Sequence, residues 1–444
     1  MTDQQRGDCL GAAGHPCLQT PTMDHIGRNG VRFSRAYATS PVCVPARRSF
    51  LSGQHPSTHR VFNNGDNAEW DGPTLPGILS DAGYQTQWIG RGMHQEPPYK
   101  RYGFDHMIFQ DYRAPDDYDE FIARRHPEST KAYYDSGIMH NDWTARPFHL
   151  EESLHPTNWT VQESLRFLQR RDPSCPFFLV TSFLAPHPPL IPPAFYFDRY
   201  LRQDLPPPAY GDWAEPPELG QIGQEPSSEH VHLTGETLRS ARAAYYGLIN
   251  HIDDQLRRIL QPVDGIRRQT GRDTIIIFLS DHGEMLGDHY RWRKSLPYEG
   301  SAHIPFIIEA PDAFGIRKNA VEETPVSIED LFPTVLDFAG IDCPDSVDGK
   351  SLLPLLRGQS GWDRPHLHLD MDHRWQSLTD GNEKYVFFPQ DGSEQLFNLS
   401  EDPRECHNLA RIPEFKDRLR FWRAELQKQI HPRTFAHFPQ APLG

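Results

Sequence analysis

The chain of 444 residues is 37% hydrophobic and 11% aromatic, which suffices for a large buried core and argues against intrinsic disorder. Its formal net charge of −15 at pH 7 argues against a surface for nucleic acid or an anionic membrane, so neither is expected as a partner. The six cysteines are scattered without a CxxC pair, and they indicate neither a zinc cluster nor a dense disulfide framework.

Taken in chain order, the first predicted elements alternate between helices and buried strands. Residues 74–83 predict a short helix that ends at a glycine. The run at 176–183 is continuously apolar, which is typical of a strand buried on both faces of a parallel sheet. Residues 238–260 carry apolar side chains at helical spacing, and 273–280 is a second buried strand. This order predicts an α/β fold with a large, mostly parallel sheet.

Polar side chains follow both buried strands. His187 comes shortly after the first strand, and Asp281 and His282 directly follow the second. Ligands of parallel sheets bind beyond the carboxyl ends of the strands, so these three residues are predicted to lie at one site.

The pattern changes after residue 360. Three short alternating runs predict strands, at 366–369, 384–388 and 395–399. An Asp391-Gly392 turn connects the last two, and a helix is predicted from about 413 to 429. We therefore expect a catalytic domain at 1–360 and, at 361–444, a small antiparallel sheet with one helix.

The segment Cys43-Val44-Pro45-Ala46-Arg47 places a cysteine four residues before an arginine, with a proline between them. It resembles the Cys-x-Pro-x-Arg motif of the type I sulfatases, in the alkaline phosphatase superfamily. In that family a separate formylglycine-generating enzyme oxidises the cysteine to formylglycine, an aldehyde that is hydrated at rest. The resemblance implies that enzyme as a partner and Cys43 as the source of a built-in formylglycine cofactor.

Further motifs of the family follow in the family's order along almost the whole chain. They are Asp3-Gln4 at the metal-binding end of the first strand, His187 in a short His-Pro loop, Asp281-His282 in the second metal segment, the sulfate-binding Lys294, and a C-terminal hallmark at 395–408. Asn64 matches a substrate-contacting asparagine of related hydrolases. The resemblance implies an alkaline phosphatase-like sheet sandwiched by helices.

One segment departs from the family pattern. The family has Gly-Lys-x-His after the third strand, whereas Gly90-Arg91-Gly92-Met93-His94 carries arginine for lysine and one extra residue. Arg91 supplies the same positive charge, in a planar group that suits a tetrahedral oxyanion.

The implied reaction is hydrolysis of a sulfate ester, which needs a nucleophile, cations around the oxygens and a proton for the leaving group. One hydroxyl of the hydrated formylglycine attacks sulfur, and the other, once deprotonated, collapses to the aldehyde and expels sulfate. We assign Arg47 to steadying the diol, and Lys294 and Arg91 to binding sulfate oxygens. His187 is the candidate acid and His94 the candidate base, because histidine titrates near working pH.

The resemblance also implies a metal. Asp3, Gln4, Asp281 and one formylglycine oxygen at position 43 are hard oxygen ligands, for which calcium is the best match. His282 adds a nitrogen ligand, which leaves manganese or zinc open.

Other functions stay open at this point. A phosphonate monoester hydrolase or phosphodiesterase of the same superfamily would share most of these residues, but the resemblance implies an uncharged residue there in place of Arg91. A binding protein without catalysis would be expected to lose Cys43 or Arg47. The expected substrate is a sulfated carbohydrate or a small aryl or alkyl sulfate, with specificity set by the segment 112–143 and the strands near His373 and Arg374.

The segment MTDQQR at residues 1–6 lacks the apolar core of a signal peptide, and no stretch is long and apolar enough to span a membrane. The expected location is therefore the cytoplasm. The resemblance implies an apolar strand ahead of Asp3, so we expect the start of the chain to lie upstream, where a signal peptide could also be missing.

Overall fold

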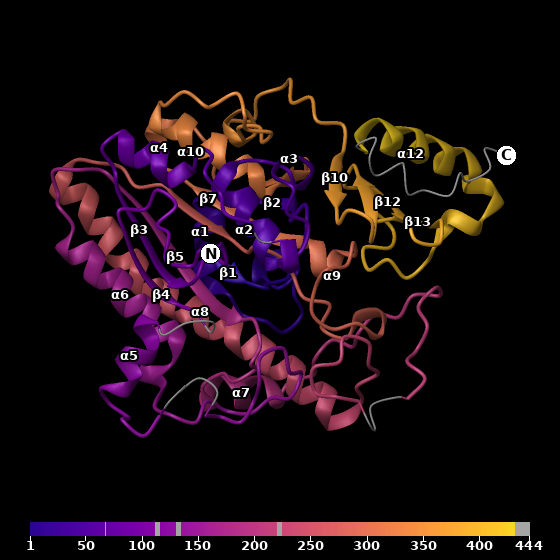
Figure 1. Cartoon of the computed structure of the whole chain (residues 1–444), viewed down its shortest axis with the longest axis horizontal. Helices are drawn as coiled ribbons and strands as arrows, with labels where there is room; N and C mark the ends of the chain where they lie inside the picture. The colour runs from indigo at the N-terminus through magenta and orange to yellow at the C-terminus, as the bar shows by residue number, and fades with distance from the viewer. Residues whose placement is uncertain (67, 112–115, 130–134, 220–223, 431–444) are drawn as a thin grey trace.

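The computed structural model describes residues 1–66, 68–111, 116–129, 135–219 and 224–430, and a large sheet in two segments forms its centre (Figure 1). The first segment has the strand order β1 (Thr2–Asp3), β5 (Phe177–Pro186), β3 (Gln85–Arg91) and β4 (His106–Gln110). The second has the order β6 (Ile276–Leu279), β7 (His303–Glu309), β2 (Gly30–Tyr37) and β8 (Ala320–Glu322), with β9 (Val326–Ser327) also paired to β2.

Strand β1 joins the two segments. Thr2 pairs with Phe183 of β5 on one side, and it forms a parallel bridge with Ser280, just after β6, on the other. Among the described strands of this sheet, only β7 runs antiparallel to its neighbours, β6 and β2. The predicted mostly parallel sheet is thus confirmed, whereas the reversed β7 was not predicted.

Helices cover both faces of the sheet. One face carries α1 (Pro21–Arg28), α6 (Pro156–Arg170), α7 (Ala194–Leu201) and α8 (Gly235–Thr270); the other carries α2 (Cys43–Ser52), α4 (Leu75–Asp81), α10 (Leu331–Ala339) and α11 (Leu353–Leu356). The short helices α3 (Pro56–His59), α5 (Asp117–Ala123) and α9 (Glu299–Ala302) lie in the connections. In β7, Ile307 packs in the core of the first face and Phe306 in that of the second. Such two-sided burial explains why the central strands are continuously apolar.

A small antiparallel sheet follows in the C-terminal part of the chain (Figure 1). Its strands pair in sequence order, as β10 (Leu367–Asp370), β11 (Gln376–Thr379), β12 (Glu383–Phe388) and β13 (Ser393–Asn398). Helix α12 (Lys416–Gln429) packs Trp422 and Leu426 against Tyr385 and Leu396. The predicted sheet and helix are confirmed, and β11 is an additional strand.

Several predicted boundaries differ from the observed ones. The predicted 238–260 helix is part of the longer α8, which continues through Pro262, and the strand predicted at 273–280 begins only at Ile276. The helix predicted at 74–83 is α4, whose first turn is capped by Thr74, which accepts a bond from Gly77 N at 3.2 Å. The division at residue 360 stays a prediction, and residues 431–444 of the second part lie outside the described residues. In the described ranges, no helix has the length and apolar character needed to cross a membrane.

Candidate active site

The carboxyl ends of the central strands meet at one edge of the sheet, and they bring the predicted residues together. Asp3 ends β1, Arg91 ends β3, and His187 directly follows β5. Asp281 and His282 come just after β6. All five side chains are buried, so the charged groups among them must stabilise one another.

Cys43 is the first residue of α2 and is only 2% exposed. Its sulfur lies 3.1 Å from Lys294 Nζ, 3.2 Å from His282 Nε2 and 3.8 Å from Asp3 Oδ1. Burial and Asp3 oppose ionisation, but Lys294 and His282 outweigh them and lower the pKa of Cys43 from its usual value. A helix N-terminus also favours negative charge. Position 43 is therefore where an anionic or nucleophilic atom is best stabilised.

Arg47 lies one helical turn after Cys43, and its guanidinium bonds to several other chain segments. Its Nε donates to Asp281 Oδ2 at 2.9 Å and its Nη2 to Asp3 Oδ2 at 3.2 Å. Its Nη1 donates to the carbonyl of Gly92 at 3.0 Å. Arg47 thus orients both carboxylates, and its predicted contact with the diol stays a prediction.

Arg91 adds a second cation to the same carboxylate. Its Nε donates to Asp3 Oδ2 at 3.1 Å, and its side chain is buried. Burial alone would raise the pKa of Asp3, but Arg47 and Arg91 hold it well below its usual range. The preceding Gly90 has φ +103°, and a Cβ there would lie 2.0 Å from the carbonyl oxygen of Ser182. Only glycine therefore lets β3 deliver Arg91 so close to β5.

Lys294 is held by the residue after Asp3. Its Nζ donates to Gln4 Oε1 at 2.7 Å, while Gln4 Nε2 donates to Glu284. Gln4 has φ 72°, a left-handed conformation that few side chains adopt. Gln4 was predicted as a metal ligand; here its side-chain oxygen bonds Lys294. Glu284 had no predicted role, although it stands in the Asp-His-Gly-Glu segment that holds the metal residues.

The remaining donors fit a divalent cation. One ligand atom each from Asp3, Cys43, Asp281 and His282 lies within 4.8 Å of the others. Arg47 binds Oδ2 of each aspartate, while both Oδ1 atoms lie 3.7 Å from His282 Nε2. His282 Nδ1 donates to the carbonyl of Gly283 at 3.0 Å, which leaves Nε2 directed into the group. Oxygen atoms with one nitrogen suit calcium, manganese or zinc.

His187 lies beside this group. Its backbone N–H donates to the carbonyl of Asp3 at 3.1 Å, and its ring Nδ1 donates to that of Pro188 at 2.6 Å. The ring stacks on His140 with centroids 4.4 Å apart. Burial, then Lys294 and His140, hold the pKa of His187 well below its usual value.

His140 belongs to the segment predicted to set specificity, but no motif singled it out. Burial, Arg91 and Lys294 lower the pKa of His140 to about 3. Residues 112–115 and 130–134 of this segment lie outside the described residues.

The other predicted residues lie around the site. Asn64 accepts a bond from Val44 N at 3.0 Å and so supports the start of α2. His94 is buried in the loop after β3 with φ 59°, and its catalytic role stays a prediction. His373 and Arg374 precede Trp375, whose indole N–H donates to Ser295 O at 3.0 Å. This bond attaches the β10–β11 connection to the Lys294 segment.

Comparison with known proteins agrees with this geometry. The family model described as Sulfatase matches residues 1–341, and the model described as N-sulphoglucosamine sulphohydrolase, C-terminal, matches residues 287–432. An arylsulfatase from Clostridium perfringens is 38% identical over 454 residues, covering 98% of this chain and 94% of the relative. A choline-sulfatase from Rhizobium meliloti is 30% identical over 436 residues, covering 93% of this chain and 82% of the relative.

Solved structures point to the same superfamily. A phosphonate monoester hydrolase of Agrobacterium radiobacter has a TM-score of 0.82 at 26% identity, with 96% of this chain and 94% of that chain covered. A sheet covered on both faces, with carboxylates, cations and a helix-borne cysteine at its carboxyl edge, defines a hydrolase of the alkaline phosphatase type. Within that superfamily, the chain belongs to the sulfatase family.

Proposed function

We propose that this enzyme hydrolyses sulfate monoesters by using residue 43, after conversion of Cys43 to formylglycine, as the nucleophile. The observation that carries the proposal is the position of the Cys43 sulfur, 3.1 Å from Lys294 Nζ and 3.2 Å from His282 Nε2 at the start of α2. Hydrated formylglycine would supply an oxygen nucleophile at this point. A divalent cation, calcium by preference, would be held by Asp3, Asp281 and His282 with the oxygen of residue 43, and would supply positive charge beside that oxygen. Gln4, the other predicted ligand, would join them once its oxygen released the bond to Lys294.

The cations of the chain provide the binding of sulfate. Lys294 is directed at residue 43 by its bond to Gln4, and it is assigned to the sulfate oxygens together with Arg91. Arg47 keeps both carboxylates oriented and is assigned to the hydrated residue 43. Since these charges are fixed before substrate arrives, they stabilise developing negative charge without reorganisation.

Two histidines are assigned to proton transfer. The His187 ring donates through Nδ1 to Pro188, so Nε2 is the atom available to protonate the leaving oxygen. To do so the ring must carry a second proton on Nε2, although burial, then Lys294, His140 and Arg91, hold the pKa of His187 well below its usual value. A bound sulfate ester anion would offset the repulsion from the two cations. His94 is assigned as the base that releases sulfate.

The decisive experiment measures the mass of the peptide that contains Cys43. Co-expression with a formylglycine-generating enzyme should replace the thiol by an aldehyde, and turnover of an aryl sulfate should rise in proportion to the converted fraction. Cys43→Ala should abolish turnover, because no oxygen nucleophile can then form. Full activity with an unconverted thiol would contradict the proposal.

A phosphonate monoester hydrolase or phosphodiesterase is the second candidate, and the similarity to the Agrobacterium radiobacter enzyme favours it. Arg91 favours sulfate, because the phosphonate hydrolases that the sequence resembles are expected to carry an uncharged residue at this position, whereas Arg91 keeps a positive charge. Assays of a sulfate monoester and a phosphonate monoester with one preparation of converted enzyme separate the two candidates. The arylsulfatase and choline-sulfatase relatives suggest small aryl and alkyl sulfates as first substrates, followed by sulfated sugars.

A further inference from the structure

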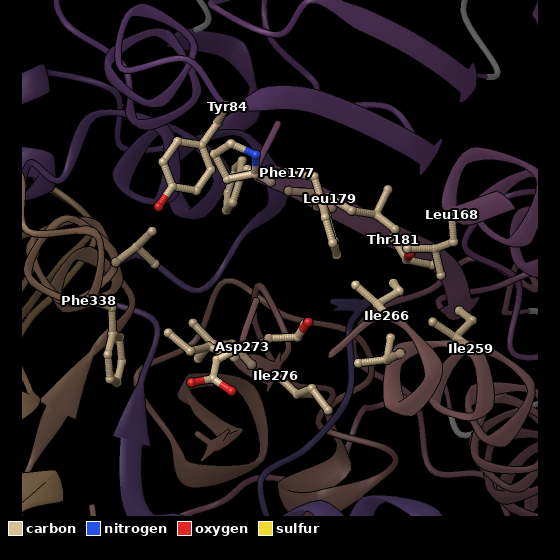
Figure 2. Close-up of a pocket in the computed structure, with 18 of the residues that line it drawn as sticks. Tyr84, Leu168, Phe177, Leu179, Thr181, Ile259, Ile266, Asp273, Ile276 and Phe338 are labelled. Carbon is tan, nitrogen blue, oxygen red and sulfur yellow. The ribbon is translucent and has the colours of Figure 1, made fainter. Parts of the chain in front are cut away.

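Two features of the described chain lie outside the active site and differ in the ligand that they suit. Figure 2 shows the first, a cavity of about 470 Å³ along β5 and β6 that is lined by side chains such as Phe177 and Leu179. A mainly apolar lining of this kind does not specify one ligand. The second feature is a cluster of His55, His368 and Asp370, whose side chains are of the types that bind metal ions.

The cluster lies where the small sheet meets the large one. His55 directly precedes α3 and caps its N-terminus. His368 and Asp370 are alternate residues of the edge strand β10, so both side chains lie on the same face of the small sheet. Asp370 N donates to the carbonyl of Thr39 at 2.7 Å, and this bond attaches β10 to the segment that leads from β2 to Cys43.

The three side chains converge on one point. One ligand atom from each lies within 4.8 Å of the others, and the ring centroids of the two histidines are 5.1 Å apart. The ligand atoms of a tetrahedral zinc site are roughly 3.3 Å apart, because zinc bonds nitrogen and oxygen at about 2.0–2.2 Å. Small side-chain rotations would therefore bring the three ligand atoms around one ion.

Gln376, in the neighbouring strand β11, orients two of the three side chains. His368 Nε2 donates to Gln376 Oε1 at 2.6 Å, which leaves the lone pair of the ring on Nδ1. Gln376 Nε2 donates to Asp370 Oδ1 at 2.6 Å, which leaves Oδ2 for another partner. Outer partners of this kind fix the tautomer and the orientation of metal ligands, and their loss weakens metal binding by roughly 10–100-fold.

His55 has a partner for either position of its ring proton. Its Nε2 lies 3.0 Å from the carbonyl oxygen of His368, and its Nδ1 lies 2.8 Å from Ser57 Oγ. Ser57 N also donates to Nδ1 at 3.2 Å, so the proton lies on Nε2 when no metal is bound. An ion bound at Nε2 would shift the proton to Nδ1, where Ser57 Oγ accepts it.

Burial and charge favour a transition-metal cation at this position. Asp370 is buried, whereas His55 and His368 are half-buried, so an ion can reach the cluster from solvent. Burial lowers the pKa of His368 to about 4, against the opposing effect of Asp370, so the ring is neutral near pH 7 and can bind a metal. Two imidazole nitrogens favour zinc over calcium, which prefers oxygen ligands.

We propose that His55, His368 and Asp370 are the ligands of a second metal site, which binds zinc and is separate from the cation proposed at Asp3 and Asp281. The ion would join β10 to the residue that precedes α3, and would so link the small sheet to the large one. Three protein ligands leave a fourth position for water. This site goes beyond the proposed sulfatase chemistry and does not depend on it.

The test measures zinc binding to the complete chain by isothermal titration calorimetry with calcium in excess, together with Tm. His368→Phe removes both ring nitrogens but keeps a ring that can stack on His55. It should weaken zinc binding at least about tenfold and remove the rise in Tm that zinc causes. The matched control is His373→Phe, at an exposed histidine after β10, which should bind zinc as the unaltered chain does. Asp281→Asn should also keep this zinc site, because it alters only the first one.

A second ligand variant and a crystallographic measurement complete the test. Asp370→Asn replaces His368→Phe if the latter does not fold, and it should weaken zinc binding in the same way. Zinc-soaked crystals of the unaltered chain should show an anomalous peak between the three side chains. Unchanged zinc binding in the ligand variants, or crystals without this peak, would overturn the proposal. Loss of all zinc binding in Asp281→Asn would do the same, because the zinc would then belong to the first site.

Discussion

At the scale of single residues, the site depends on how its buried charges share partners. Arg47 takes one oxygen of Asp3 and one of Asp281, and the other oxygens stay beside Cys43 and His282. Asp281 and His282 were predicted from the end of a buried strand, and Asp3, Cys43 and Arg47 from their resemblance to the motifs of the sulfatase family. Neither route could predict His140, which reaches His187 through tertiary packing from a segment without a motif.

The metal assignment predicts that calcium stabilises the folded chain through Asp281. After chelation, added calcium should raise the Tm of the unaltered chain, and Asp281→Asn should weaken its binding by more than about tenfold, because a charged ligand is lost. Isothermal titration calorimetry and thermal unfolding measure the two effects. Asp273→Asn, an exposed carboxylate ahead of β6, is the matched control and should bind calcium normally. A Tm that no divalent cation shifts would refute the site.

A second residue-scale prediction concerns the pH dependence of stability. Asp253 accepts bonds from Thr22 N and Met23 N at the start of α1, yet burial dominates and raises its pKa from 3.8 to about 7. The folded state therefore holds a proton that the unfolded state releases above pH 3.8. Stability is fully present below that pH and is lost as pH rises through about 7, by roughly 2–4 kcal/mol.

Asp253→Asn keeps an acceptor for the helix start but removes the titration. Its Tm should fall less between pH 5 and 8 than that of the unaltered chain, and it should be the more stable protein at pH 8. If the Tm profiles of the two proteins ran parallel across this pH range, the pKa of the Asp253 carboxyl group would not be raised in the folded chain.

At the scale of elements, the burial of each strand decided what could be predicted. Strands β5 and β6 are apolar on both faces, so their sequences alone identify them. Strand β11 is the four residues Gln376–Thr379, three of them polar, and is buried by contacts from both neighbours and α12. No local pattern marks such a strand. The direction of β7 depends on where the chain re-enters the sheet, which periodicity does not reveal.

Gly90 offers a test of how β3 delivers Arg91. Gly90→Ala places a Cβ 2.0 Å from Ser182 O at φ +103°, so it should cost at least about 3 kcal/mol and reduce activity. Gly83→Ala is the matched control, since Gly83 has φ +87° with nothing within 4 Å, and should cost about 1–2 kcal/mol. Urea unfolding and initial rates measure both. If Gly90→Ala and Gly83→Ala lowered the free energy of unfolding equally, the positive φ alone, and not the close approach to β5, would require glycine at position 90.

At the scale of the whole molecule, a buried ion network attaches the small sheet to the large one. Lys384 Nζ of β12 lies 2.6 Å from Glu299 Oε1 of α9 and 2.9 Å from Glu405 Oε1. It also donates to the carbonyl of Pro297 at 3.0 Å, three residues from Lys294. Burial raises the pKa of Glu405 to about 7 in spite of Lys384, whereas at Glu299 burial is outweighed by Lys384 and His303, which lower the pKa.

Removal of the Lys384 ammonium group should therefore destabilise the small sheet and the large sheet together. Lys384→Met leaves Glu299 and Glu405 without their cation and should cost about 3–5 kcal/mol in the free energy of unfolding, with a loss of activity. Lys428→Met, at an exposed lysine paired with the partly buried Glu425, should change stability by less than about 1 kcal/mol. Adding Glu405→Gln to Lys384→Met should recover part of the loss. If Lys384→Met and Lys428→Met were equally stable, the ion network would not be what attaches the small sheet to the large one.

The two-residue strand β1 is the junction, here called the seam, between the two segments of the large sheet. Among the described residues, ladder pairing between the two sheet segments passes through Thr2. Arg91 and His187 lie on one side of this seam, and Asp281, His282 and the Lys294 segment on the other. The active centre thus straddles the line along which the sheet would part. A group that binds residues of both sheet segments, such as the guanidinium of Arg47 or an ion between Asp3 and Asp281, therefore links the segments as well as serving the chemistry. Filling the site should then also stabilise the junction between the segments.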